Sequence, residues 1–341
     1  MLKRSLLCFY CCIATFTFYG LQCCAQTDTI TLKQGINLIG QIVSADNSNL
    51  QFKTDFSSEA LNIKWSEITA LKGKNSYRVL SIDGNIAVGW LLMDTLQKQK
   101  LKVIANDTVL MDKGAIIEIK AFDKRISNRL KLDIDLGVIR TKANNSDQVN
   151  FEFALKYPAK RWDFGLNYAA FVSSADTISN VRAGLNLSAK YNLPKRWFSL
   201  LQLSSFKSTE QQIDYRVNYL LGVGKYLYRK DKINISIYLG GTYNREKFTP
   251  SDVVFKTAEA FGGLHFELFP KEKLRIVSEF ITYPSLSQSG RWRNYSKTDL
   301  LISLVKHFRF GMGYTLNTDS NPPVNSSRAD YLFNVKLGWS L

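Results

Sequence analysis

Apolar and polar residues alternate in segments of about ten residues from Arg129 to the end of the chain. In the first of these segments Leu132 and Ile134 alternate with Asp133 and Asp135. A period of two places successive side chains on opposite faces of a strand, and about ten residues is the length that a tilted strand needs to cross a bilayer. The pattern therefore predicts membrane strands with one face toward lipid and the other toward a polar lumen.

The alternation predicts twelve such strands in sequence. They lie near residues 130–138, 149–157, 162–168, 181–191, 197–205, 215–223, 233–243, 258–268, 274–283, 300–304, 308–316 and 331–341. The segment at 197–205 alternates less cleanly than the others. An even number of antiparallel strands can close into an outer-membrane barrel, so we predict a twelve-stranded antiparallel transmembrane β-barrel over residues 129–341.

The connections between these strands also alternate in length. Short turns are expected near residues 158–161, 192–196, 229–232, 270–273 and 306–307, and longer polar loops near 141–148, 172–179, 206–213, 246–256, 284–294 and 317–329. Outer-membrane barrels place short turns on the periplasmic side and long loops outside the cell. Both ends of the barrel segment are therefore expected on the periplasmic side, in the outer membrane of a Gram-negative bacterium.

A shorter strand pattern fills the region before the barrel. Gly35 and Gly40 lie five residues apart, and Gly84 and Gly89 repeat that spacing about 50 residues later. Alternating strand-like segments follow each pair of glycines. The loose repeat predicts an all-β periplasmic domain over residues 26–122, made of two small SH3-like or Sm-like units.

The first residues have the features of a secretory signal peptide. Lys3 and Arg4 precede an apolar stretch at residues 6–19, and small residues at Cys23 and Ala25 predict cleavage after Ala25. The apolar stretch is shorter than the roughly 20 residues of a membrane-spanning helix. A lipid anchor on Cys23 or Cys24 is the less favoured alternative, since Gln22 stands where a small residue is expected.

Cleavage at this position would leave a mature chain without cysteine. The five cysteines, all within the predicted signal peptide of residues 1–25, are Cys8, Cys11, Cys12, Cys23 and Cys24. Disulfides, thiol catalysis and cysteine-ligated metals are thereby excluded. The formal charge of +16 does not imply a nucleic-acid partner, because basic residues such as Lys33 and Lys53 are interspersed with acids in an exported protein.

The predicted inward face of the barrel carries charges of both signs. The basic members are Lys131, Lys156, Arg182, Lys190, Arg216, Arg275, Lys297, Arg309 and Lys336, and the acidic members are Asp133, Asp135, Glu152, Asp163, Glu267, Glu279 and Asp299. Seven of these are the candidate functional residues, namely Arg182, Arg216, Arg309, Lys336, Asp133, Asp135 and Glu267. Such charges either pair and close the narrow lumen or leave a small, basic-leaning pore, and we favour the mostly closed, ion-paired lumen.

Few residues offer conventional catalytic chemistry. Of the two histidines, His265 is predicted on the lumen face beside Glu267, and His307 in a turn; both are read as structural. We therefore expect no catalytic residue, metal or cofactor. The segment Gly222-Val223-Gly224-Lys225 resembles part of a phosphate loop, but it lies within an alternating strand, so its glycines are predicted to be close-packed lumen positions.

Motifs in both regions resemble a known family. Leu32-Lys33-Gln34-Gly35 and Ile63-Lys64-Trp65-Ser66-Glu67-Ile68, followed by Val335-Lys336-Leu337-Gly338-Trp339, are similar to the salt-induced outer-membrane proteins grouped as domain of unknown function 481. The resemblance implies a barrel, its compartment and a link to envelope stress, with no catalytic residues. The final strand also resembles the signal that the barrel-assembly machinery reads, except that Leu341 replaces the usual terminal aromatic residue.

The sequence thus favours a non-enzymatic outer-membrane barrel that serves envelope integrity or small-solute passage. Its expected partners are outer-membrane lipid, the barrel-assembly machinery and a periplasmic protein docked on the N-terminal domain. A membrane-embedded lipid hydrolase and a surface adhesin that uses the longer loops remain the alternatives.

Overall fold

The computed structural model describes most of the chain after the predicted signal peptide. The described residues are 27–45, 48–57, 59–93, 99–105, 107–123, 125–141, 146–175, 178–230, 232–250, 253–271, 273–304, 307–322 and 327–340. The predicted signal peptide and its cysteines lie outside these ranges. No helix within them is long and apolar enough to cross a membrane.

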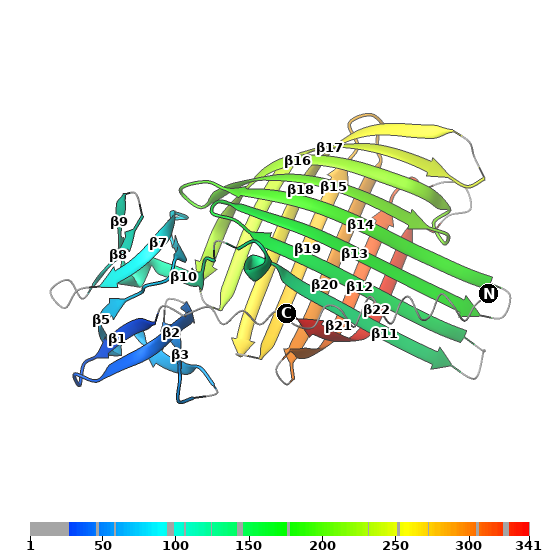
Figure 1. Cartoon of the computed structure of the whole chain (residues 1–341). Helices are drawn as coiled ribbons and strands as arrows, with labels where there is room; N and C mark the ends of the chain where they lie inside the picture. The colour runs from blue at the N-terminus through cyan, green and yellow to red at the C-terminus, as the bar shows by residue number, and fades with distance from the viewer. Residues whose placement is uncertain are drawn as a thin grey trace.

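Twelve strands form a closed barrel in which each strand pairs with its neighbours in sequence and the last pairs with the first (Figure 1). They are β11 (Lys131–Thr141), β12 (Ser146–Pro158), β13 (Trp162–Ala175), β14 (Ile178–Asn192), β15 (Trp197–Ser208), β16 (Ile213–Lys230), β17 (Ile233–Phe248), β18 (Val254–Lys271), β19 (Leu274–Pro284), β20 (Trp292–Ser303), β21 (Phe308–Asp319) and β22 (Ala329–Ser340). All pairings are antiparallel, so the predicted fold class is confirmed.

The outer surface of the barrel carries the apolar residues that the alternation assigns to it. Leu221, Leu239 and Leu337 are 66%, 61% and 62% exposed, whereas a core residue of a soluble protein would be buried. The less clean alternation of β15 also has a cause, because Phe198 and Leu200 are apolar on its inward face and pack in the lumen. A closed barrel with an apolar outer face is the architecture of outer-membrane proteins.

The loops are shorter than the polar segments suggest. The polar pattern predicts a loop at residues 172–179, but β13 continues to Ala175 and β14 begins at Ile178, with Ser174 paired to Ser179. In the same way β17 extends to Phe248, β18 begins at Val254 and β20 at Trp292. Polar residues continue these strands because their backbone groups stay paired in the ladder.

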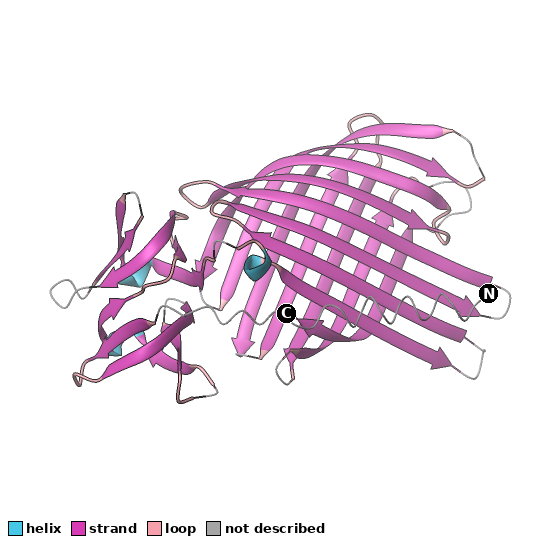
Figure 2. Ribbon diagram, in the orientation of Figure 1, coloured by secondary structure: helices cyan, strands magenta, loops and turns pink. Residues whose placement is uncertain are grey.

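The N-terminal domain is a ten-stranded all-β unit. Its strands are β1 (Asp28–Leu32), β2 (Asn37–Ala45), β3 (Asn49–Thr54), β4 (Leu61–Lys64), β5 (Ile68–Lys72), β6 (Tyr77–Ser81), β7 (Ile86–Met93), β8 (Lys100–Ile104), β9 (Thr108–Asp112) and β10 (Ile116–Ala121), with 3-10 turns η1 (Trp65–Glu67), η2 (Lys113–Ala115) and, in the linker, η3 (Ser127–Arg129). Figure 2 shows that strands dominate both parts of the chain.

The two predicted repeats are combined in one sheet instead of forming separate units. The strands β1, β5, β7, β6, β10 and β2 pair in that order, and β2 pairs back to β1, so that six strands form a small closed ring. One apolar core fills it, with residues from both halves such as Ile30, Phe52, Leu101 and Ile119. Each half of the domain runs through the same succession of elements, and Gly35 and Gly84 occupy equivalent turns with positive φ.

A buried carboxylate helps to close this ring. Asp28 accepts hydrogen bonds from the backbone amides of Ile42 (2.9 Å) and Lys74 (2.8 Å) and from the Tyr77 hydroxyl. Burial, together with the hydrogen bond to Asp28, raises the pKa of Tyr77 well above its ordinary value. The hydroxyl therefore remains a donor, and Asp28 ties β1, β2 and β6 together.

The N-terminal domain lies at the end of the barrel where the predicted short turns are located (Figure 1). The amide of Arg196, in the turn between β14 and β15, donates to the carbonyl of Asp83 (3.1 Å). The Arg78 side chain donates to the carbonyl of Lys160 (3.0 Å) in the turn between β12 and β13. We refer to this end of the barrel as the domain end and to the opposite end as the loop end.

Candidate functional site

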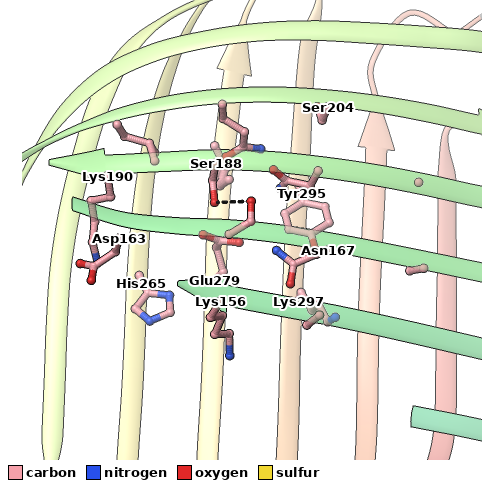
Figure 3. Close-up of a pocket in the computed structure, with 18 of the residues that line it drawn as sticks. Lys156, Asp163, Asn167, Ser188, Lys190, Ser204, His265, Glu279, Tyr295 and Lys297 are labelled. Atoms are coloured by element: carbon pink, nitrogen blue, oxygen red, sulfur yellow. Dashed lines mark hydrogen bonds and ion pairs between the residues drawn. The ribbon is translucent and has the colours of Figure 1, made fainter. Parts of the chain in front are cut away.

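A cavity of about 1280 Å³ occupies the barrel interior. Its lining begins at Val43 and Ser44 of the N-terminal domain and reaches Asp319 and Pro322 at the loop end. Figure 3 shows part of the wall, with Lys156, Lys190, His265, Glu279, Tyr295 and Lys297 around the same space. The alternation of each strand brings these polar side chains inward, opposite the apolar outer face.

Buried ion pairs cross the loop end of the lumen. Glu246, at the end of β17, accepts from Arg216 (2.7 Å) and from Arg291 (2.7 Å), and Arg291 also binds Asp319 (2.6 Å). Glu246 and Arg291 are 1% and 3% exposed. Arg291 precedes β20 and Asp319 ends β21, so this cluster links β16 and β17 to β20 and β21.

Two further pairs extend the charged layer. Arg293 binds Glu259 (2.5 Å), and the same carboxylate accepts from the amide of Asn244 (2.7 Å). Arg182 binds Asp330 at 2.7 Å. Charges removed from water need partners of this kind, and breaking one such buried pair typically costs several kcal/mol. We call the residues Arg182, Arg216, Arg291, Arg293, Glu246, Glu259, Asp319 and Asp330 the loop-end ion cluster.

A second group of ion pairs lies where the barrel closes between β11 and β22. The described register of these strands has four pairs, from Asp133–Ser340 to Leu136–Leu337. Arg309 of β21 donates to Asp133 (2.6 Å) and to both oxygens of Asp135 (2.9 and 2.8 Å), reaching across β22. Arg309 therefore adds bonds across the part of the barrel with the shortest ladder.

Gly338 makes this crossing possible. It pairs with Arg309 on one side and with Asp135 on the other, so the two side chains meet directly above it. A Cβ at this position would collide with the Asp135 carboxylate and the Arg309 guanidinium. Only glycine leaves space for the pair along the wall.

Lys336 completes the network beside the closure. Its ammonium lies 2.7 Å from Glu152, 3.5 Å from Asp299 and 3.8 Å from Asp135. Lys297 in turn lies 3.4 Å from Asp299. Three carboxylates from β11, β12 and β20 thus surround one buried lysine.

Aromatic side chains fill another part of the lumen. Phe198, Tyr226, Tyr238 and Phe261 form a buried cluster inside the barrel, and Tyr238 donates to Glu279 (2.7 Å). The rings lie over inward glycines; the Phe261 ring lies against Gly222 and Gly240, and the Phe198 ring against Gly224. The prediction that Gly222 and Gly224 are close-packed lumen positions is confirmed.

All seven candidate charged residues lie in ion pairs within the described structure. Besides the pairs above, Glu267 binds Arg275 at 2.5 Å. Sequence reasoning missed Glu246, Arg291, Arg293 and Asp319, because it assigned them to loops. For Arg293 a signal was present, since it continues the inward phase of Tyr295 and Lys297.

The histidines occupy the predicted positions. His265 and Glu267 both line the cavity, and His307 contacts the carbonyl of Ser340 through Nδ1 (2.8 Å). Among the residues that the structure describes, no three His, Cys, Asp or Glu side chains form a group that could hold a metal ion.

The sequence matches the family model "Protein of unknown function, DUF481" over residues 134–341. The chain belongs to this family. The match covers more than half of the chain and nearly the whole of the DUF481 barrel, while the N-terminal domain lies outside it. No curated protein matches the chain.

Several solved structures are similar to the DUF481 barrel. The NanC porin shares 10% identity over 62% of this chain and 100% of that one, with a TM-score of 0.39. A KdgM porin in complex with disordered oligogalacturonate shares 12% identity over 62% and 99%, with a TM-score of 0.35. The translocator domain of the autotransporter NalP from Neisseria meningitidis shares 11% identity over 62% and 86%, with a TM-score of 0.33. Such low similarity supports no inference on function.

Proposed function

We propose that this DUF481 protein is a non-enzymatic outer-membrane barrel that passes small polar solutes, with its loop-end ion cluster acting as a gate. The observation that carries the proposal is the cavity of about 1280 Å³, whose lining runs from the N-terminal domain to the loop end. A barrel that served envelope integrity alone would gain nothing from so large an unfilled interior, because packed side chains stabilise better than open space.

The loop-end ion cluster supports gating. Its carboxylates each meet an arginine, so the mouth is crossed by neutral, hydrogen-bonded pairs and no large surplus of charge faces the solute. Displacing Arg291, which bridges Glu246 and Asp319, would widen the mouth.

The proposed partners follow from the apolar outer face of the barrel and from the N-terminal domain at its domain end. Outer-membrane lipid contacts the apolar face, the barrel-assembly machinery inserts the barrel, and the N-terminal domain faces the periplasm, where it docks a partner. Its sheet supports docking, because β9 is an edge strand that, among the described strands, pairs with β8 alone, and Val109 and Leu110 on it are exposed.

We expect the gate to be measurable as current through single barrels in planar bilayers. Replacing Arg216 and Arg291 together with serine should raise conductance severalfold and shift selectivity toward cations, because Glu246 and Asp319 lose their partners and admit water. The control is Arg245→Ser, which lies next to Glu246 on β17 but is exposed on the outward face of that strand, and which should leave the current unchanged. A wild-type barrel that conducts strongly, with the double variant no different, would refute the gate; silence of both would refute passage.

The proposed orientation predicts a difference in protease access on intact cells. A protease site inserted at Ser287, in the connection between β19 and β20, should be cut from outside, whereas one inserted after Lys72, in the N-terminal domain, should be protected until the outer membrane is permeabilised. Immunoblotting of both variants provides the measurement. Cleavage at the second site alone would place the domain outside the cell.

A further inference from the structure

The domain end of the cavity carries more positive than negative charge. Among the described residues that line it there, seven are basic and three are acidic. The basic residues are Arg78, Lys120, Arg129, Lys131, Lys156, Lys190 and Arg229, and the acidic ones are Glu118, Asp163 and Glu267. We call this part of the cavity the vestibule. The loop-end ion cluster, by contrast, has four residues of each sign.

The three acids of the vestibule are already bound. Asp163 lies 3.6 Å from Lys190 and 3.9 Å from Arg78, and Glu118 pairs with Lys120. Glu267 is held by Arg275, which is not among the seven basic residues. Although burial acts against it, the neighbouring Lys120 keeps the pKa of Glu118 below its ordinary value, so Glu118 is charged at neutral pH. Lys156 also lies 3.5 Å from Asp133, a carboxylate outside the lining that is shared with Arg309. With this acid included, the vestibule still has a surplus of cations.

Three of the basic residues, Arg129, Lys131 and Arg229, are in no ion pair with a described residue. Arg129 lies between the rings of Phe122 and Tyr157, with its guanidinium carbon 4.5 and 4.7 Å from their centroids, and its buried Nε has no hydrogen-bond partner. Arg229 lies over the ring of Tyr226 at 4.3 Å. Aromatic faces fix the position of a guanidinium without neutralising its charge.

We propose that the vestibule is a binding site for a small molecule with several negative charges, carried by phosphate or carboxylate groups. Cations held close together in a partly enclosed space repel one another, and an anion with several charged groups relieves this repulsion more than a single chloride does. The site is shared between the domain, which supplies Arg78 and Lys120, and the barrel, which supplies Lys156 and Arg229. Binding does not require the lumen to conduct, so it can fail or succeed independently of the proposed passage.

Titration calorimetry on the full-length protein in detergent tests the site, with tripolyphosphate and citrate as anionic probes and maltose as a neutral one. We expect one or both anions to bind, more weakly as salt is raised. Replacing Lys131, Lys156 and Arg229 together with glutamine should weaken binding by about tenfold, the factor that 1.4 kcal/mol represents. The control variant replaces Lys195, Lys225 and Lys230 with glutamine. It loses the same three positive charges, but from residues outside the cavity lining, and should retain the wild-type affinity.

A second variant separates loss of the site from loss of the fold. Asp163→Asn removes an acid from the vestibule and should tighten anion binding severalfold, a gain that misfolding cannot produce. Binding of only one of the two anions would identify its acidic group as the ligand class. The proposal would be overturned if neither anion bound, if maltose bound equally, or if the two triple variants lost affinity alike.

Discussion

Replacing Arg309 with alanine is expected to lower the free energy of unfolding of the barrel by about 3 kcal/mol, the low end of the usual cost of breaking a buried ion pair, because Arg309 and Asp133 are only partly buried. The variant leaves Asp133 and Asp135 without the guanidinium that binds them at 2.6 to 2.9 Å. Both carboxylates lie beside the four-pair register of β11 and β22, so the loss falls where few ladder bonds hold the barrel closed.

Urea unfolding in lipid vesicles, followed by tryptophan fluorescence, gives the measurement. The control is Arg275→Ala, which removes an arginine that binds one carboxylate, Glu267. Because the Arg275 side chain is 40% exposed, its pair should contribute less than about 1 kcal/mol. Equal losses of unfolding free energy in the two variants would show that the contacts of Arg309 between β11 and β22 stabilise the barrel no more than an exposed ion pair does.

A charge on the lipid face should be about as costly. Leu221→Arg, near the middle of β16 and 66% exposed on the outer surface, is expected to destabilise the folded barrel by about 2 to 4 kcal/mol, because the guanidinium must enter hydrocarbon. Asn218→Arg, on the inward face of the same strand, lines the cavity and should cost much less. The readout is the fraction of heat-modifiable folded protein after insertion into vesicles. Similar losses for both positions would contradict the outward face of Leu221.

The sequence predicted the barrel well because its determinants are local. Leu221 faces outward and Asn218 inward in consequence of a period of two, and pairing between adjacent strands follows the chain order. The prediction was wrong where strand pairing is not determined by the local alternation of apolar and polar residues. Ser174 and Ser179 are polar and were assigned to a loop, yet they pair with each other because strands of this barrel continue beyond the apolar band. In the N-terminal domain, β1 pairs with β5 and β10 with β2, contacts that no short-range pattern reveals.

For the candidate site too, the sequence predicted which way side chains face but not which of them meet. Alternation placed Arg309 and Asp135 on one inward face but did not say that they meet, since that contact joins residues 174 positions apart in sequence. Arg291 and Arg293 lie at or just before the polar beginning of β20, which resembles a loop in sequence, so neither was predicted to face the lumen. The surplus of cations in the vestibule depends on Arg78, and only the position of the N-terminal domain brings Arg78 to the barrel.

Gly338 favours one register of β22 in the closed barrel. A displacement of β22 by one residue would put Leu337 or Trp339 between Arg309 and Asp135, and a displacement by two would put Lys336 or Ser340 there. In each case a side chain would stand where the guanidinium and carboxylate must meet, and two charges would remain unpaired. Because Gly338 has no side chain, the Arg309–Asp135 pair favours one alignment of β22 between β21 and β11 over its neighbours.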